Sequence, residues 1–170
     1  MGYDYTKKLQ AVGQVDTMSC WAACISWWTQ AMALNVKRRG QTQLDLIGKF
    51  MKYMGDDGGV SPAFLKKIGA DAEVRMTVEY ITAAKFKEYT DLDSPVVVVF
   101  KYPVLGGTHM NVIFNQSGDT VSAMEPFYPL PGEDGKRTGK YERRSLSFYC
   151  NTTEVGVGYL PLADAFEQDQ

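Results

Sequence analysis

The feature that most restricts the fold of this sequence is a tryptophan-rich segment near its N-terminus. Trp21, Trp27 and Trp28 fall within eight residues, and apolar side chains recur at spacings of three and four over residues 20–34. This spacing predicts a helix that has Ser19 at its N-cap. Because apolar side chains cover most of its circumference, the helix has to be buried on nearly all sides.

Two more helices and several strands are expected after this segment. A helix over residues 42–53 ends at the glycine-rich stretch 55–59, and Ser61-Pro62 opens a short third helix. Residues 95–100, PVVVVF, form a continuous β-branched run that is typical of a strand buried on both faces. Shorter strands are expected at 73–80, 108–114, 120–124, 145–150 and 154–159.

The order of these elements predicts an α+β fold, because the helices come first and the antiparallel strands second. A long loop rich in Pro, Gly and charge is expected from Pro126 to Lys140. With 170 residues, of which 45% are hydrophobic, the chain is predicted to form a single domain over residues 1–170.

The net charge of the chain bears on which kinds of partner it is expected to bind. The formal net charge is −2, which favours neither a nucleic-acid partner nor a membrane surface. The short basic clusters Lys37-Arg38-Arg39 and Arg143-Arg144 are interpreted as solvated surface. No signal peptide and no apolar run of transmembrane length is recognised.

The number and spacing of the cysteines indicate free thiols rather than disulfides. Cys20, Cys24 and Cys150 are an odd number without a CxxC pair, so a disulfide framework is not expected. With a single histidine they also make a poor zinc set, and no metal or cofactor is implied. Reduced thiols suit a cytosolic working place. Cys24 and Cys150 are interpreted as structural.

One cysteine is placed for catalysis. Cys20 lies in the first turn of the predicted helix, where the helix dipole and free N–H groups favour a thiolate. The same N–H groups can stabilise an oxyanion, and Gln14 can add a side-chain amide donor. His109 is the only candidate for the general base, and it follows Gly106-Gly107-Thr108 at the start of an apolar strand. Asp16 is interpreted as a loop or cap residue.

The sequence resembles papain-like cysteine peptidases in the order and spacing of four residues: Gln14, Cys20 followed by Trp21, and His109 on the strand after PVVVVF. The likeness covers roughly residues 10–128. It is to the compact bacterial branch without a propeptide, which includes bacteriocin-processing and staphopain-like peptidases and papain-like toxin domains. This resemblance implies a papain-like fold, in which a helical half carrying the nucleophile packs on an antiparallel sheet half.

A third catalytic residue has to orient the histidine. In this branch it is an acidic or amide residue, often Asp before Pro, on the strand after the histidine strand, and Glu125-Pro126 holds that place here. A two-residue loop at Ser117-Gly118 places His109 opposite Pro126, and a three-residue loop places it opposite Glu125. Asn111, on the same strand face as His109, and Asp119, in the turn, are the alternatives.

The resemblance implies a thiol protease, a hydrolase that cleaves peptide bonds of a protein substrate. Cys20 is expected to attack, His109 to transfer the proton, Glu125 to orient the ring, and Gln14 with the Cys20 N–H to bind the oxyanion. The same chemistry leaves open a papain-fold glutamine deamidase or transglutaminase-like toxin. A degenerate fold that serves as a binding module is the third hypothesis, and the complete Gln–Cys–His set argues against it.

The biological hypothesis follows from the lack of a propeptide. A protease that is active where it is made needs export or a protein inhibitor. We therefore expect a secreted or injected bacterial effector or toxin, delivered without a classical signal peptide. It would act in the cytoplasm of a target cell and be held in check by an immunity protein.

Overall fold

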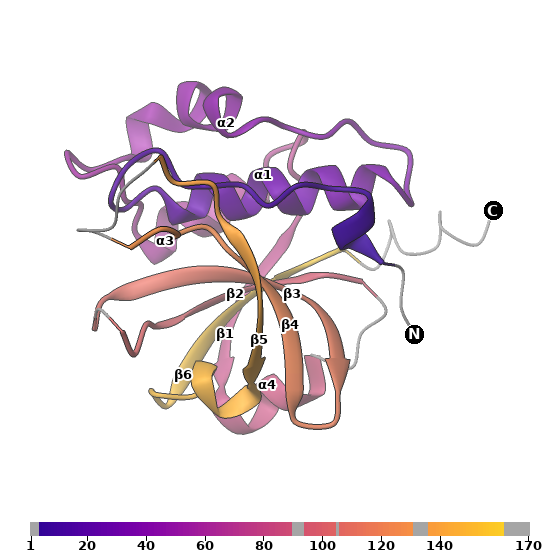
Figure 1. Ribbon diagram of the computed structural model, residues 1–170. Coiled ribbons are helices and arrows are strands. Elements are labelled where there is room, and N and C mark those ends of the chain that lie inside the picture. Colours follow the sequence, from indigo (N-terminus) through magenta and orange to yellow (C-terminus); the bar gives the residue numbers. More distant parts are fainter. Residues whose placement is uncertain (1–3, 90–93, 105, 131–135, 162–170) are drawn as a thin grey trace.

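A layer of helices covers one face of a curved antiparallel sheet in the computed structural model of this protein (Figure 1). The structure describes residues 4–89, 94–104, 106–130 and 136–161. The elements follow in the order η1 (Tyr5–Lys7), α1 (Cys20–Ala33), α2 (Gln43–Phe50), η2 (Met51–Tyr53), α3 (Pro62–Gly69), β1 (Thr77–Thr82), α4 (Ala83–Tyr89), β2 (Val96–Lys101), β3 (Thr108–Ser117), β4 (Thr120–Glu125), β5 (Lys140–Ser145), η3 (Leu146–Tyr149) and β6 (Glu154–Tyr159).

The sheet has the strand order β1-β6-β2-β3-β4-β5, and every neighbouring pair is antiparallel. The predicted α+β class is therefore confirmed. Helices α1, α2 and α3 lie on one side of the sheet, and α4 lies near its opposite end (Figure 1). None of the helices in the described ranges is long and apolar enough to cross a membrane.

Helix α1 is buried as its composition predicts. The side chains of Trp21, Trp27 and Trp28 are each at most 1% exposed. Burying an indole requires a partner for its N–H group. Trp28 donates to the carbonyl of Pro95 over 2.9 Å, and Trp27 donates to the Tyr141 hydroxyl over 3.0 Å. These bonds attach α1 to the sheet at β2 and β5.

Strand β2 separates two hydrophobic cores. Val97 and Val99 pack into the core under α1. Val96, Val98 and Phe100 point the other way, into a second core closed by residues of α4 and η3. Burial on both faces explains the uninterrupted β-branched run.

The structure differs from the expected secondary structure in three features. The predicted strand at 145–150 is the end of β5 followed by η3, because polar residues 140–145 pair with β4 as an edge strand, where charged side chains reach solvent. Helix α4 was not expected; Thr82 caps its first turn by accepting from the Lys85 N–H. Ser19 holds the N-cap position of α1, but its hydroxyl bonds Asp16 instead of capping.

Candidate active site

Cys20 and His109 meet where the N-terminus of α1 faces the start of β3. Cys20 is the first residue of α1, and His109 is the second residue of β3. Both line a cleft of about 160 Å³. The rest of its wall is mainly apolar and includes Val60, Pro62, Leu65, Tyr80 and Val99. The residues that carry the predicted chemistry thus share one accessible space.

The glycine-rich segment after η2 forms a wall of this cleft and is attached to α1. The indole of Trp21 donates to the carbonyl of Gly58 over 2.8 Å. Gly58 has a φ of 89°, a conformation that favours glycine. Gly59, the next residue, lines the cleft together with Cys20. Trp21 therefore fixes the position of the cleft wall relative to the thiol.

Glu125 is the residue that contacts the far side of the His109 ring. The distance from His109 Nε2 to Glu125 Oε2 is 2.5 Å, and the same oxygen accepts from the Phe127 N–H over 3.0 Å. The Glu125 side chain is fully buried. Since Nε2 is occupied by Glu125, Nδ1 is the ring nitrogen left to serve Cys20, which lines the same cleft as His109.

The other two candidates for this role lie elsewhere. Asn111 Oδ1 accepts from Arg144 and Tyr149. Asp119 is in the β3–β4 turn, where its carbonyl accepts from the Leu146 N–H. Of the three, the structure places only Glu125 against the imidazole.

The expected strand register is wrong, although it placed Glu125 near His109. Ser117 pairs with Thr120, so the turn is Gly118-Asp119 rather than Ser117-Gly118. A bulge between Ile113 and Asn115 then shifts the pairing, and Val112 pairs with Met124. Glu125 therefore lies one position beyond Met124, on the side toward Asn111, and reaches His109 diagonally. Neither the turn position nor the bulge has a clear signature in the sequence.

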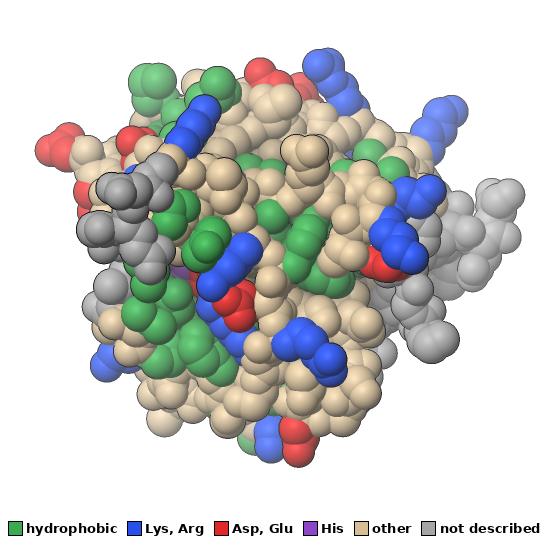
Figure 2. Space-filling view, in the orientation of Figure 1, with side chains coloured by type: hydrophobic (Ala, Val, Ile, Leu, Met, Phe, Trp, Pro, Cys, Tyr) green, Lys and Arg blue, Asp and Glu red, His purple; other side chains and the backbone are tan. Residues whose placement is uncertain are grey.

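Aromatic rings enclose the His109 side chain, which is 6% exposed. Tyr102 stacks on it with ring centroids 4.6 Å apart, and Phe100 and Phe127 present their edges at 5.8 and 6.1 Å. On the face shown in Figure 2, hydrophobic side chains gather beside the small visible part of the histidine. The rings shield the His109–Glu125 bond from water, which strengthens it.

The charges of this site are strongly coupled. Burial lowers the pKa of His109, but its hydrogen bonds to Cys20 and Glu125 and their negative charge outweigh burial and raise this pKa to about 9. Burial raises the pKa of Glu125, but His109, the Phe127 N–H and Arg144 outweigh it and lower this pKa to about 2. Between these values the imidazolium–carboxylate pair is the favoured state.

This pair makes stability depend on pH. Because the pKa of His109 is raised from 6.5 to about 9, its contribution is complete below about pH 6.5 and is lost as pH rises toward 9. The lowered Glu125 pKa gives a contribution that is complete above about 4.5 and is lost toward pH 2. We expect the free energy of unfolding in urea to fall by roughly 2–3 kcal/mol between pH 6.5 and 9.5. The His109→Ala variant should lack this fall, and an equal alkaline loss in both proteins would contradict the assignment.

Gln14 lies beside the site, but its amide is engaged. Its Nε2 donates to the carbonyls of Asp16 and Thr17, both over 2.8 Å, and its Oε1 is buried without a hydrogen-bond partner. The Gln14 N–H donates to Pro126, which joins the segment before Cys20 to the segment after Glu125. An oxyanion role requires one Nε2 hydrogen to leave its carbonyl, and this role stays a prediction.

The remaining cysteines lie outside the cleft lining. Cys24 is fully buried one turn after Cys20 and donates to the Met110 carbonyl over 3.3 Å; burial raises the pKa of its thiol. Cys150 is partly buried, packs against the second core and is a free thiol. Within the described ranges, no group of three or more His, Cys, Asp or Glu residues is arranged to hold a metal ion.

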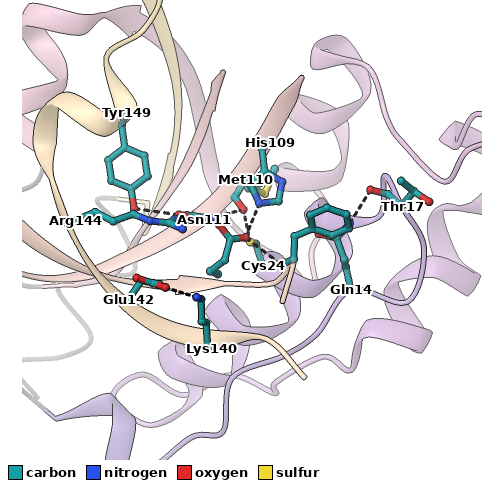
Figure 3. Close-up of polar contacts among 12 residues, drawn as sticks. Gln14, Thr17, Cys24, His109, Met110, Asn111, Lys140, Glu142, Arg144 and Tyr149 are labelled. Atoms are coloured by element: carbon teal, nitrogen blue, oxygen red, sulfur yellow. Dashed lines mark hydrogen bonds and ion pairs between the residues drawn. The ribbon is translucent and has the colours of Figure 1, made fainter. Parts of the chain in front are cut away.

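Sequence reasoning missed residues that surround His109 and Glu125, among them Arg144 and Tyr102. Arg144 was interpreted as solvated surface, but its side chain is only 11% exposed and donates to Glu125 Oε1 over 3.0 Å. Figure 3 shows it beside Asn111 and Tyr149. Tyr102 covers His109 from the loop after β2. Neither carries a local signal, because both act through contacts between strands that are far apart in the sequence.

Comparison with known proteins supports the fold. No protein-family model and no curated protein sequence matches this chain. Among solved structures, it is similar to the peptidase domain of Streptococcus ComA, a bi-functional ABC transporter involved in a quorum-sensing pathway. The TM-score is 0.57 at 17% identity, covering 89% of this chain and 98% of that domain. The fold is therefore papain-like, as the resemblance predicted.

Proposed function

We propose that this protein is a cysteine peptidase that hydrolyses peptide bonds of a protein substrate. The observation that carries the proposal is that Cys20 and His109 line the same cleft while Glu125 bonds the far side of the His109 ring. The similarity in fold to the ComA peptidase domain supports the same reaction class. Because one fold can support different reactions, the proposed chemistry is inferred from the residues of the site.

The proposed reaction begins with the Cys20 thiolate attacking the scissile carbonyl carbon while His109 is protonated. The carbonyl π electrons move to oxygen, and the resulting oxyanion is stabilised by the backbone N–H of Cys20 at the start of α1. His109 then donates its proton to the leaving amine as the C–N bond breaks. Water, deprotonated by the same imidazole, hydrolyses the thioester and frees Cys20. Glu125 keeps the ring oriented throughout.

The cleft supports an extended peptide with an apolar side chain next to the scissile bond. Its wall beside Cys20 consists of residues such as Val60, Leu65 and Val99, which offer dispersion contacts and no charge. We therefore propose that the substrate places an apolar side chain in this cleft, beside the cleaved bond.

Selective alkylation tests the thiolate. Iodoacetamide at mildly acidic pH is expected to label Cys20 first, because imidazolium stabilises its thiolate, whereas Cys24 is buried and its pKa is raised. Peptide mapping of the labelled protein measures the distribution, and the His109→Ala variant should label Cys20 at least about tenfold more slowly. Equal labelling of the three cysteines in both proteins would contradict the proposed ion pair between the Cys20 thiolate and the His109 imidazolium.

A glutamine deamidase or transglutaminase-like enzyme is the second candidate, because a thiolate–imidazolium pair also attacks side-chain amides. Intact-mass spectrometry of a panel of candidate proteins distinguishes the two reactions. Proteolysis splits the substrate chain into two fragments, whereas deamidation leaves it whole and adds about one dalton, and cross-linking joins two chains. A whole, heavier product that depends on Cys20 would replace the peptidase proposal.

We also propose that the protein is a delivered bacterial effector or toxin that acts in the cytoplasm of a target cell. A site in which Cys20, His109 and Glu125 are already assembled supports restraint by an immunity protein in the producing cell. Induced expression in a bacterial cytosol is the test: wild type should arrest growth and Cys20→Ala should not. Normal growth with active wild-type peptidase present would contradict the toxin proposal and leave the peptidase proposal intact.

A further inference from the structure

We infer that Arg144 is a positioning residue of this site, holding the Glu125 carboxylate ionised and aimed at His109. The inference rests on the proposed peptidase chemistry and adds a fourth residue to Cys20, His109 and Glu125. Arg144 touches neither the thiol nor the cleft lining, so it would act through Glu125.

Arg144 bonds the carboxylate oxygen of Glu125 that does not contact His109. Glu125 Oε2 is shared by His109 and the Phe127 N–H, and Oε1 accepts from Arg144 over 3.0 Å. A fully buried carboxylate with one oxygen left bare would suffer a large desolvation penalty. Arg144 therefore satisfies the oxygen that does not serve the histidine, which fixes the rotation of the carboxylate.

The guanidinium of Arg144 is itself held in place by neighbouring side chains. The same Nη1 that bonds Glu125 donates to Asn111 Oδ1 over 2.5 Å, and Tyr149 donates to that oxygen over 3.0 Å. The guanidinium carbon lies 4.3 Å from the Phe148 ring centroid, in cation–π contact. Residues from β3, β4, β5 and η3 thus meet at Arg144 (Figure 3).

Arg144 also balances the charge of the site. In the active state the thiolate, the imidazolium and the carboxylate sum to one negative charge in a poorly solvated space. The Arg144 cation neutralises it and favours the anionic form of Glu125, which in turn stabilises the imidazolium that faces Cys20. Its removal should therefore weaken this imidazolium and shift the pH profile of Cys20 alkylation to higher pH.

Other groups around the network have partners or are neutral. Lys140 and Glu142, on the same strand, form an ion pair with each other. The remaining titratable groups near it are Cys24 of α1, Tyr102 after β2, and Tyr149 of η3, whose pKa values are all raised by burial. The described surroundings of Glu125 therefore contain no second cation in contact with its carboxylate other than His109 and Arg144.

The test compares Arg144→Gln with Arg143→Gln and Arg144→Lys. Arg143 pairs with Ser122 on β4, whereas Arg144 pairs with Val121, so the two arginines point to opposite faces and Arg143 is exposed. The first measurement is the rate of Cys20 alkylation by iodoacetamide as a function of pH, which needs no substrate. The second is kcat and KM on a peptide that the wild type cleaves.

Arg144→Gln should raise the midpoint of the alkylation profile by about half to one pH unit and lower kcat about tenfold, with KM within about twofold. Arg143→Gln should match wild type. Arg144→Lys should keep the midpoint, because the charge remains, and lose about threefold in kcat, because one ammonium cannot hold both acceptors in the same geometry.

An unchanged midpoint in folded Arg144→Gln, whatever its thermal stability, would reduce Arg144 to a structural role and overturn the inference. If Arg144→Gln fails to fold, Arg144→Lys decides, and wild-type kcat in that variant would overturn it. If the wild type cleaves no peptide, the proposed function fails. The pH profiles of Cys20 alkylation would still show whether Arg144 influences Cys20.

Discussion

Replacing Cys20 with alanine is expected to lower peptide hydrolysis by roughly 10⁴-fold or more, with almost no change in fold or Tm. The loss is large because Cys20 is the only thiol among the described residues that line the cleft: Cys24 and Cys150 do not line it. The structural cost is small because Cys20 lies at the first turn of α1 and is 9% exposed, so losing one sulfur leaves no enclosed cavity. Initial rates with a fluorogenic peptide and thermal unfolding by circular dichroism measure the two effects.

Cys24→Ala is the matched control, because it makes the same chemical change one turn further along α1. It should retain near-normal activity and lose about 1–2 kcal/mol of stability, since it empties a fully buried site and removes the hydrogen bond to Met110. Full turnover in Cys20→Ala together with an inactive Cys24→Ala would show that the nucleophile was assigned to the wrong thiol.

Changes at Glu125 should have the second-largest effect on turnover, roughly 10- to 10³-fold. Loss of the acidic orienter in a serine triad lowers turnover about 10⁴-fold, but a thiolate–imidazolium pair forms before substrate binds, so we expect a smaller loss here. Glu125→Gln retains a hydrogen-bond acceptor for His109 and loses the charge. Glu125→Ala should be worse, because the ring loses its anchor and Arg144 loses its buried partner. The measurement is kcat and kcat/KM across pH, with circular dichroism to confirm folding.

Two further variants place these losses in context. Asn111→Ala should be milder than either Glu125 variant, because Asn111 contacts Arg144 and Tyr149 but not the ring. Asp119→Ala should be close to wild type, because Asp119 lies in the distant β3–β4 turn. Near-normal rates for both Glu125 variants beside a crippled Asn111→Ala would transfer the orienting role to Asn111.

The sequence alone determined the elements whose reasons are local or periodic. Three tryptophans on one helix cannot be exposed, so the burial of α1 followed from composition and spacing. The β-branched run of β2 has no polar face, so a strand covered on both sides was the consistent solution. Ser61 caps α3 as expected, because a hydroxyl just before a helix start bonds the N–H group three residues on, and Thr42 caps α2 in the same way.

Part of the site was also accessible from sequence. A single histidine left no choice of base, and a cysteine opening a buried helix singled out Cys20. Glu125 entered through the likeness to papain-like peptidases and the proximity of β3 and β4. The predicted register was wrong, yet Glu125 contacts His109, because a glutamate side chain spans the diagonal distance between neighbouring strand positions.

Only the tertiary structure decided the surroundings of these residues. Arg144 occurs in a polar segment whose charges indicate a solvated edge strand, and nothing local distinguishes it from Arg143. Its role depends on which face of β5 turns inward and on the pairing of β5 with β4, both set by long-range packing. The bulge in β3 and the stacking of Tyr102 on His109 arise in the same way. Sequence periodicity specifies which faces are apolar, but the register and the meeting of distant strands depend on the complete core.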